Sequence, residues 1–175
     1  MKNNVVVAIS LILLLCFLSC DKSSITPTEE DIPITDDNLC QTWVLIKKEI
    51  NNTIELLPVN DKYPVTLTFY PTNGFCGRHD ANSYEGKYEI NQDTISFSNI
   101  FVTDVCDIDW YLNYLSELGK TNKVLISSQC ENTNNMQLQL SNNDNSIILY
   151  FINKKWFEET YSEFEEWYNC VLYNY

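Results

Sequence analysis

Three residues near the middle of the chain, Arg78, His79 and Asp80, carry the side chains best suited to chemistry. His79 is the only histidine in the sequence, so imidazole chemistry has to use it. A histidine works as a general base when a carboxylate orients its ring, and Asp80 follows it directly. Neighbouring side chains point to opposite faces of a strand but can converge in a loop. The three residues therefore predict either a catalytic base or, in the interpretation we favour, polar groups that satisfy the backbone of an irregular turn.

Three aspartates, Asp104, Asp107 and Asp109, surround Cys106 and form a second candidate site. Carboxylates at this spacing can bind calcium, but the glycine and the terminal glutamate of a calcium-binding loop are missing. Asp107 and Asp109 also suit the start of a helix, where they cap free N–H groups and compensate the helix dipole. The chain contains no CxxC, HExxH or GxSxG motif and no phosphate-binding loop. We therefore expect no metal and no cofactor.

The cysteines provide a third kind of chemistry. Seven are present, and Cys16 and Cys20 lie in the N-terminal segment. The other five are an odd number, so in an oxidising compartment at least one thiol stays free or pairs between molecules. We predict a disulfide between Cys76 and Cys106, because each borders the central strands, although the sequence does not fix the pairing. The five are Cys40, Cys76, Cys106, Cys130 and Cys170.

Residues 1–19 have the features of an export signal. Lys2 supplies a positive charge, residues 5–17 are mostly apolar but too few to span a bilayer, and Ser19 precedes Cys20. The segment resembles the signal peptide of a bacterial lipoprotein, in which the cysteine is acylated, although Phe17 stands where leucine is usual. We therefore predict a lipid on Cys20 and a place in the bacterial cell envelope, at the outer membrane. An ordinary cleaved signal peptide and an uncleaved anchor are the alternatives.

The acidic composition limits the partners and predicts a tether. The formal net charge of −13 repels phosphates, which excludes nucleic acid as a partner. Residues 20–38 are rich in acidic, hydroxyl and proline residues and hold only three isoleucines and no large aromatic residue, so they predict a flexible acidic tether after the lipidated cysteine. The folded domain is therefore expected over residues 39–153, followed by a C-terminal segment at 154–175.

Alternating hydrophobic residues predict that this domain is a sheet. Val65, Leu67 and Phe69 alternate with polar or exposed positions, and Ile95 and Phe97 repeat the pattern after a polar turn at 91–93. We therefore predict a mostly β fold with minor α content, in which an antiparallel meander forms a small barrel-like sheet. Further short runs of this kind lie at 43–50, 54–57, 124–127, 136–140 and 146–152.

Glycines mark irregular points in this pattern. Gly86 lies inside a strand pattern and predicts a bulge or a close approach of the backbone. Gly74 ends a Pro-Thr-Asn-Gly turn, and we expect it to supply a positive φ. The spacing of Leu112, Leu115 and Leu118 predicts one internal helix, which we expect Gly119 to end in the left-handed conformation.

A second helix is predicted at residues 154–172. Five apolar residues follow one another at spacings of four, three, four and three, which gathers them on one face. The opposite positions hold several glutamates, which argues against binding to an anionic membrane surface. We therefore expect an amphipathic helix that packs its aromatic face on the domain. The stripe consists of Phe157, Tyr161, Phe164, Tyr168 and Val171.

The order of these features resembles the META/HslJ-like domain family over residues 40–152. That family has a strand, a Gly-x-x-x-x-Asn segment, a Tyr-x-Gly-x-Tyr strand, a Thr-x-x-Cys segment, a helix and a last hairpin. Its usual Gly-Cys before the asparagine is replaced here by Asp80 and Ala81, so a disulfide that uses that cysteine cannot be carried over. The matching positions are residues 66–69, Gly77, Asn82, Tyr84, Gly86, Tyr88, Thr94, Ile95, Thr103, Cys106, Leu115, Leu118, Leu138 and Leu140.

The resemblance implies a small β-rich domain on secreted or lipid-anchored bacterial proteins that are linked to envelope stress and antibiotic tolerance. It implies no known reaction, and a fold alone cannot supply one. We therefore predict a non-enzymatic envelope lipoprotein that binds a protein, a peptide or an apolar ligand and reaches the membrane through Cys20. The alternative is a hydrolase or metal-dependent enzyme that uses His79 with an aspartate of the 104–109 cluster.

Overall fold

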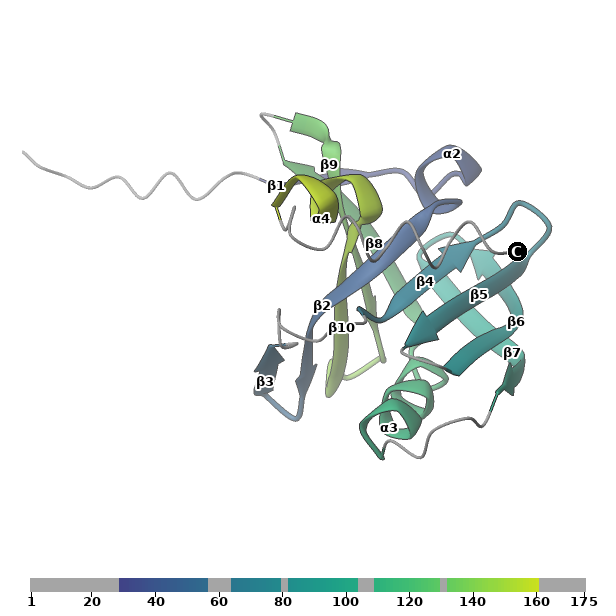
Figure 1. The fold of residues 1–175 in the computed structure, drawn as a ribbon. Coiled ribbons are helices and arrows are strands. Elements are labelled where there is room, and N and C mark those ends of the chain that lie inside the picture. The colour runs from purple at the N-terminus through teal and green to yellow at the C-terminus, as the bar shows by residue number, and fades with distance from the viewer. Residues whose placement is uncertain (1–28, 57–63, 80–81, 104–108, 130–131, 161–175) are drawn as a thin grey trace, which may run out of the picture.

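A computed structural model describes residues 29–56, 64–79, 82–103, 109–129 and 132–160, and Figure 1 shows their arrangement. In this part of the chain, ten strands form one antiparallel sheet and three short helices surround it. The elements are β1 (Glu29–Ile32), α2 (Asp36–Leu39), β2 (Thr42–Ile50), β3 (Thr53–Leu56), β4 (Thr66–Phe69), β5 (Gly74–His79), β6 (Asn82–Asn91), β7 (Thr94–Val102), α3 (Asp109–Leu118), β8 (Lys123–Gln129), β9 (Asn132–Ser141), β10 (Ile147–Asn153) and α4 (Lys154–Thr160).

The sheet curls into a ring with one weak junction. The strand order β8-β7-β6-β5-β4-β2-β10-β9 returns to β8 through a long β8–β9 pairing, while β1 adds to β8 and β3 adds to β2. At the junction, the register of β7 and β8 contains one pair, Thr94 with Lys123. The fold is therefore mostly antiparallel β and ring-like without being a true barrel, which confirms the predicted fold class.

Asparagines make most of the tight turns of this sheet. Asn51 and Asn52 have φ of 51° and 64° in the β2–β3 turn, and Asn73 has a φ of 60° before β5. Asparagine tolerates this left-handed region because its side chain can bond locally. The positive φ expected at Gly74 and Gly119 was wrong, because Asn73 takes that role in its turn and Gly119 still donates its N–H to the Leu115 carbonyl at 3.0 Å.

The folded part begins earlier than the composition predicts. β1 lies within the predicted flexible tether and pairs with β8, where Ile32 lies opposite Ile126. Ile32 and Ile34 pack against the hydrophobic core, and α2 ends at Leu39, which is buried. The tether boundary at residue 38 is therefore corrected, and residues 29–39, which we call the strap, belong to the domain. Two isoleucines two positions apart supply apolar contact that the acidic composition hides.

A bulge in β2 directs a lysine side chain toward the inside of the ring. The register of β10 with β2 shifts between Tyr150 and Phe151, which leaves Ile46 as an extra residue. Because a shift of one residue exchanges the faces of a strand, Lys48 comes to lie opposite the core residue Leu149. The side chain of Lys48 is consequently only 4% exposed.

Helix α3 closes the ring on the side to which Lys48 points. The Lys48 ammonium lies 3.3 Å from Glu117 of α3 and 3.4 Å from Glu55 of β3. On the same helix, the hydroxyl of the fully buried Tyr114 lies 2.8 Å from that of Tyr84 in β6. α3 covers the predicted internal helix from residue 109 onward, and polar as well as apolar contacts join it to the sheet.

Helix α4 packs on the outer surface of the ring. Phe157, the first residue of the predicted aromatic stripe, is buried in a second small cluster with Val44 and Ile152, and Trp156 packs against it. α4 lies on β2, β9 and β10 (Figure 1). The docking predicted for the C-terminal helix is therefore confirmed for α4, and residues 161–175 lie outside the described part. No helix of that part is long and apolar enough to cross a bilayer.

Candidate functional site

A cavity lies between the strap and the neighbouring strand β6. Its volume is about 460 Å³, which is typical of sites for small ligands or single side chains of a partner. One wall comes from β6 and the turn before β5, and the other comes from the strap. The lining residues are Ile34, Thr35, Asp36, Leu39, Asn73, Tyr88, Glu89 and Ile90.

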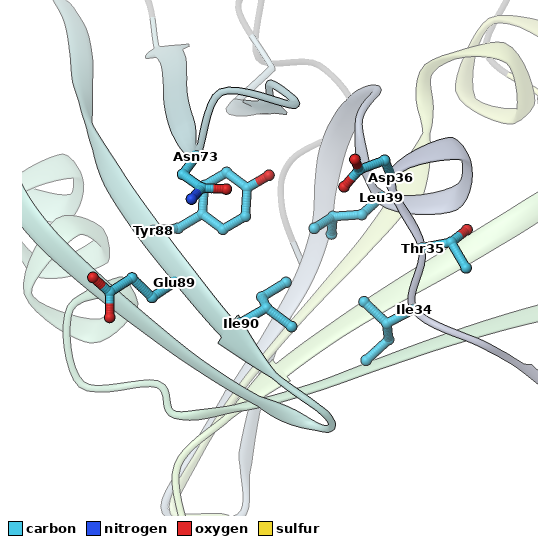
Figure 2. Close-up of a pocket in the computed structure, with 8 residues that line it drawn as sticks. All are labelled: Ile34, Thr35, Asp36, Leu39, Asn73, Tyr88, Glu89 and Ile90. Carbon is cyan, nitrogen blue, oxygen red and sulfur yellow. The ribbon is translucent and has the colours of Figure 1, made fainter.

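The two walls present apolar side chains to each other. Figure 2 shows Ile34 of the strap and Ile90 of β6 pointing toward one another. Both isoleucines also pack against the core of the ring. The side chains of Thr35 and Glu89 turn away from the space between the walls. An apolar group of a ligand would therefore lie between the two isoleucines.

Tyr88 is held at the β6 wall by a chain of hydrogen bonds. Its hydroxyl donates to the Tyr70 carbonyl at 2.9 Å, so the Cys40 thiol, 3.8 Å away, is the donor to the Tyr88 oxygen. The Tyr88 ring also meets the Phe69 ring edge-on, with centroids 4.9 Å apart. Burial first, and then the contact with Cys40, raises the pKa of Tyr88 above its usual value. Tyr88 is therefore a fixed, neutral wall of the cavity and not a base.

Asp36 and Asn73 form the polar rim of the cavity. The Asn73 carbonyl accepts the Tyr88 N–H at 2.9 Å, which fixes the turn, while its side chain and that of Asp36 make no hydrogen bond or ion pair with the described residues. Burial is the main cause of the raised pKa of Cys40, and the charges of Asp36 and Asp37 raise it further. The rim is thus electronegative and can receive hydrogen-bond donors or a positive charge.

His79 lies elsewhere. It is the last residue of β5, 9% exposed, and opposite Asn82 of β6, and neither residue lines the cavity. Arg78 precedes it on β5, opposite Thr66. The structure describes only the backbone of Asp109, so the enzyme alternative stays a prediction. The other aspartates of that alternative, Asp104 and Asp107, lie outside the described residues, and so does Asp80, which follows His79.

Two glycines of the family-like motif make room for aromatic rings. Gly77 lies opposite Tyr84, and Gly86 lies opposite Phe75, in the register of β5 with β6. A Cβ atom on Gly77 would overlap the Tyr84 ring and the Thr66 carbonyl, and one on Gly86 would overlap the Phe75 ring. The Tyr84 hydroxyl reaches over Gly77 to donate to that Thr66 carbonyl at 2.6 Å. These motif residues therefore build the wall of the ring and do not line the cavity.

The remaining motif residues also serve the sheet. Two residues of β7 lie opposite Gly86, because the register shifts between Glu85 and Lys87, so the predicted bulge is confirmed. Thr103 accepts the Ser83 N–H at 2.8 Å through its hydroxyl. Of the whole motif, only Tyr88 lines the cavity.

The structure assigns different surroundings to the cysteines. Cys76 is a free thiol whose sulfur lies 3.1 Å from the Tyr70 hydroxyl, so the predicted disulfide with Cys106 is not formed. Cys106 itself and the proposed lipid site Cys20 lie outside the described residues. Cys40 is also free. Among the described residues, no three His, Cys, Asp or Glu side chains lie close enough together to hold a metal ion.

The comparison with known proteins supports the fold. No protein-family model matches the chain, and no curated protein matches it. The fold recurs in solved bacterial proteins. A protein from Burkholderia xenovorans, solved by NMR, is 20% identical with a TM-score of 0.56, and the match covers 77% of this chain and 96% of that one. A DUF4847 family protein from Bacteroides vulgatus is 12% identical with a TM-score of 0.51, covering 67% and 95%.

Motif reasoning missed most of the cavity. Ile34, Thr35 and Asp36 lay in the predicted tether, Leu39 was the first residue of the predicted domain, and Asn73 and Ile90 belonged to a turn and a strand without a marked role. The one available signal was the pair Ile32 and Ile34, whose spacing of two fits a strand. A cavity between segments that are far apart in sequence leaves no local pattern.

Proposed function

We propose that this chain is a META/HslJ-like, lipid-anchored protein of the bacterial cell envelope whose domain binds an organic cation with an apolar arm, without catalysis. The cation is a free amine or the side chain of a lysine or arginine on a partner protein. The cavity between the strap and β6 is the observation that carries the proposal.

The cavity suits such a ligand in both of its parts. Asp36 offers a carboxylate at the rim, where an ammonium or guanidinium group forms a charge-assisted hydrogen bond. Ile34 and Ile90 offer an apolar space beneath it, and burial of the arm there supplies most of the affinity. The net charge of −13 attracts cations toward the whole domain.

The anchor is supported by the sequence. Residues 1–19 and Cys20 have the features of a lipoprotein signal, and only residues 21–28 separate Cys20 from β1. A Cys20→Ala variant tests the anchor in membranes of the producing bacterium. We expect the parent protein to carry acyl chains by mass spectrometry and to partition into detergent, and the variant to do neither. Equal partitioning of the two proteins would contradict the anchor.

Binding is tested by titration calorimetry of the full-length protein with phenethylammonium, which joins an ammonium group to a phenyl arm. Ile34→Trp fills the cavity and is expected to abolish binding, whereas Ile54→Trp, at a β3 position that is 58% exposed, leaves it unchanged. Asp36→Asn removes the rim charge and is expected to weaken binding roughly tenfold, which corresponds to about 1.4 kcal/mol. Asp37→Asn, which does not line the cavity, is the matched control.

A second titration distinguishes the two sources of the cation. A peptide with a lysine between apolar residues should bind more tightly than phenethylammonium if the partner is a protein, and no better if the ligand is a free amine. A parent protein that binds neither compound would contradict the proposed function.

A further inference from the structure

The strap is both the wall of the cavity and the segment that leads toward Cys20. We infer that residues 29–36 of the strap dock and undock as a unit, that the docked form is the binding form, and that ligand binding and strap docking therefore stabilise each other. The part of this inference that concerns ligand rests on the proposed function. Three features of the strap carry it.

First, the N-terminal half of the strap is held on one side only. β1 stands at the end of the strand order and pairs with β8 through four register pairs, from Glu29 with Gln129 to Ile32 with Ile126. In the described part of the chain, no strand pairs with its other edge. Segments with few buried contacts and one row of hydrogen bonds open at a lower free energy than the core strands do.

Second, the charges of the strap favour release. Its four acidic side chains that the structure describes, Glu30, Asp31, Asp36 and Asp37, are exposed and take part in none of the ion pairs found among the described residues. Close negative charges repel one another when docking holds them together. The apolar contacts that oppose this repulsion in the N-terminal half are those of Ile32 and Ile34, and both side chains are only partly buried.

Third, the C-terminal half of the strap is fixed, so it can act as a hinge. Leu39 is 2% exposed, and its carbonyl accepts the Trp43 indole N–H at 2.9 Å. The Gln41 side chain donates to the Asn38 carbonyl at 2.7 Å, and the Asn38 side chain donates to the Pro33 carbonyl at 2.9 Å. Release would therefore involve residues 29–36 and would end near α2.

This geometry makes the strap and the ligand thermodynamically linked. Ile34 and Asp36 leave the cavity when the strap is released, whereas Tyr88 and Ile90 stay with β6. A ligand that contacts both walls binds the docked form better, and by linkage it must then favour docking. With Cys20 in a membrane, release would also lengthen the connection between the lipid and the domain.

Hydrogen exchange of the full-length protein tests the inference. Without ligand, we expect peptides from residues 29–36 to exchange roughly 100-fold faster than those from β9, because they open without global unfolding. Saturating phenethylammonium should slow exchange of the strap roughly tenfold and leave β9 unchanged. Exchange of the strap together with β9, or a strap rate that bound phenethylammonium does not change, would overturn the inference.

A matched pair of variants tests the same linkage from the opposite direction. Ile32→Asp places a charge opposite Ile126 and should release the strap, which weakens phenethylammonium binding roughly tenfold when only a tenth of the molecules stay docked. Ile54→Asp, at an exposed position of β3, should have no effect. Unchanged affinity in Ile32→Asp would overturn the linkage alone. Absence of binding by the parent protein would overturn the proposed function together with it.

Discussion

The interior of the ring is built differently on two sides. One is the α3 side, which includes the β5–β6 wall, and the other is the side of the strap. Around α3 the interior is filled, because Tyr84 covers Gly77 and contacts Tyr114 while Lys48 pairs with Glu117. Beside the strap, the sheet is joined by a single β7–β8 register pair, and a cavity remains. In Figure 1, α3 and α2 lie on opposite sides of the ring. The residues that stand out in the sequence build the filled side, whereas the cavity consists mainly of residues without a motif.

The largest effect is expected on the filled side, from Gly77→Ala. The new Cβ would displace the Tyr84 ring, so the variant should lose about 4 kcal/mol of unfolding free energy or fail to fold. Gly74→Ala is the matched control, because its Cβ would meet only atoms at 3.8 Å or more and should cost about 1 kcal/mol or less. Urea unfolding measures both. Equal stability of the two variants would show that the Gly77–Tyr84 contact does not hold this side together.

The next effect concerns the lysine inside the ring. Lys48→Met leaves the Glu117 carboxylate, which is 14% exposed, without this ammonium, and the expected loss is about 3 kcal/mol. The double variant Lys48→Met/Glu117→Leu should recover most of it, because the carboxylate that then remains, that of Glu55, is 48% exposed and can be hydrated. Lys47→Met, on the outer face over the Tyr150 ring, should cost about 1 kcal/mol or less. A double variant as unstable as Lys48→Met would contradict the role assigned to the ion pair.

Two tyrosine hydroxyls sharpen the comparison between the sides. Tyr84→Phe removes a buried bridge between Thr66 and Tyr114 and should cost about 2 kcal/mol. Tyr88→Phe removes a partly buried hydroxyl at the cavity wall and should cost about 1 kcal/mol. Thermal and urea unfolding give both values. A greater loss in Tyr88→Phe would mean that the cavity side is the more tightly built.

The smallest effect is a dependence on alkaline pH. The hydrogen bond with Cys76, then burial and the Cys76 charge, raises the pKa of Tyr70 to about 12. Because the folded protein then holds this proton more tightly than the unfolded chain does, the stabilisation is complete below about pH 10 and is lost as the pH rises toward 12. Tyr70→Phe should therefore flatten the decline in unfolding free energy over this range. An unchanged decline would assign it to other groups.

Much of the fold could be predicted because short stretches of sequence carry the spacing of individual strands and helices. The alternation of Val65, Leu67 and Phe69 and the spacing of three between Leu112, Leu115 and Leu118 follow directly from strand and helix geometry. Lys48 could not be placed inside the ring, since its inward position depends on a bulge that a paired strand reveals. The strap was missed because its acidic composition outweighed two isoleucines.

The site was less predictable than the fold. Candidate chemistry at His79 rested on residue type, whereas the cavity rests on the approach of Asp36 to Asn73 and of Ile34 to Ile90, which no spacing in the sequence records. Among the motif residues, Tyr88 alone belongs both to the core and to the cavity, because it is buried in the core and also lines the cavity.

The most direct test of the account is a set of nuclear Overhauser contacts from phenethylammonium to the methyl groups of the full-length protein. The account predicts contacts from the phenyl arm to Ile34 of the strap and to Ile90 of β6 in the same complex, and none to the exposed Ile54 and Leu56 of β3. Contacts to β3 alone, or to Ile90 without Ile34, would contradict a binding site that is built from both walls.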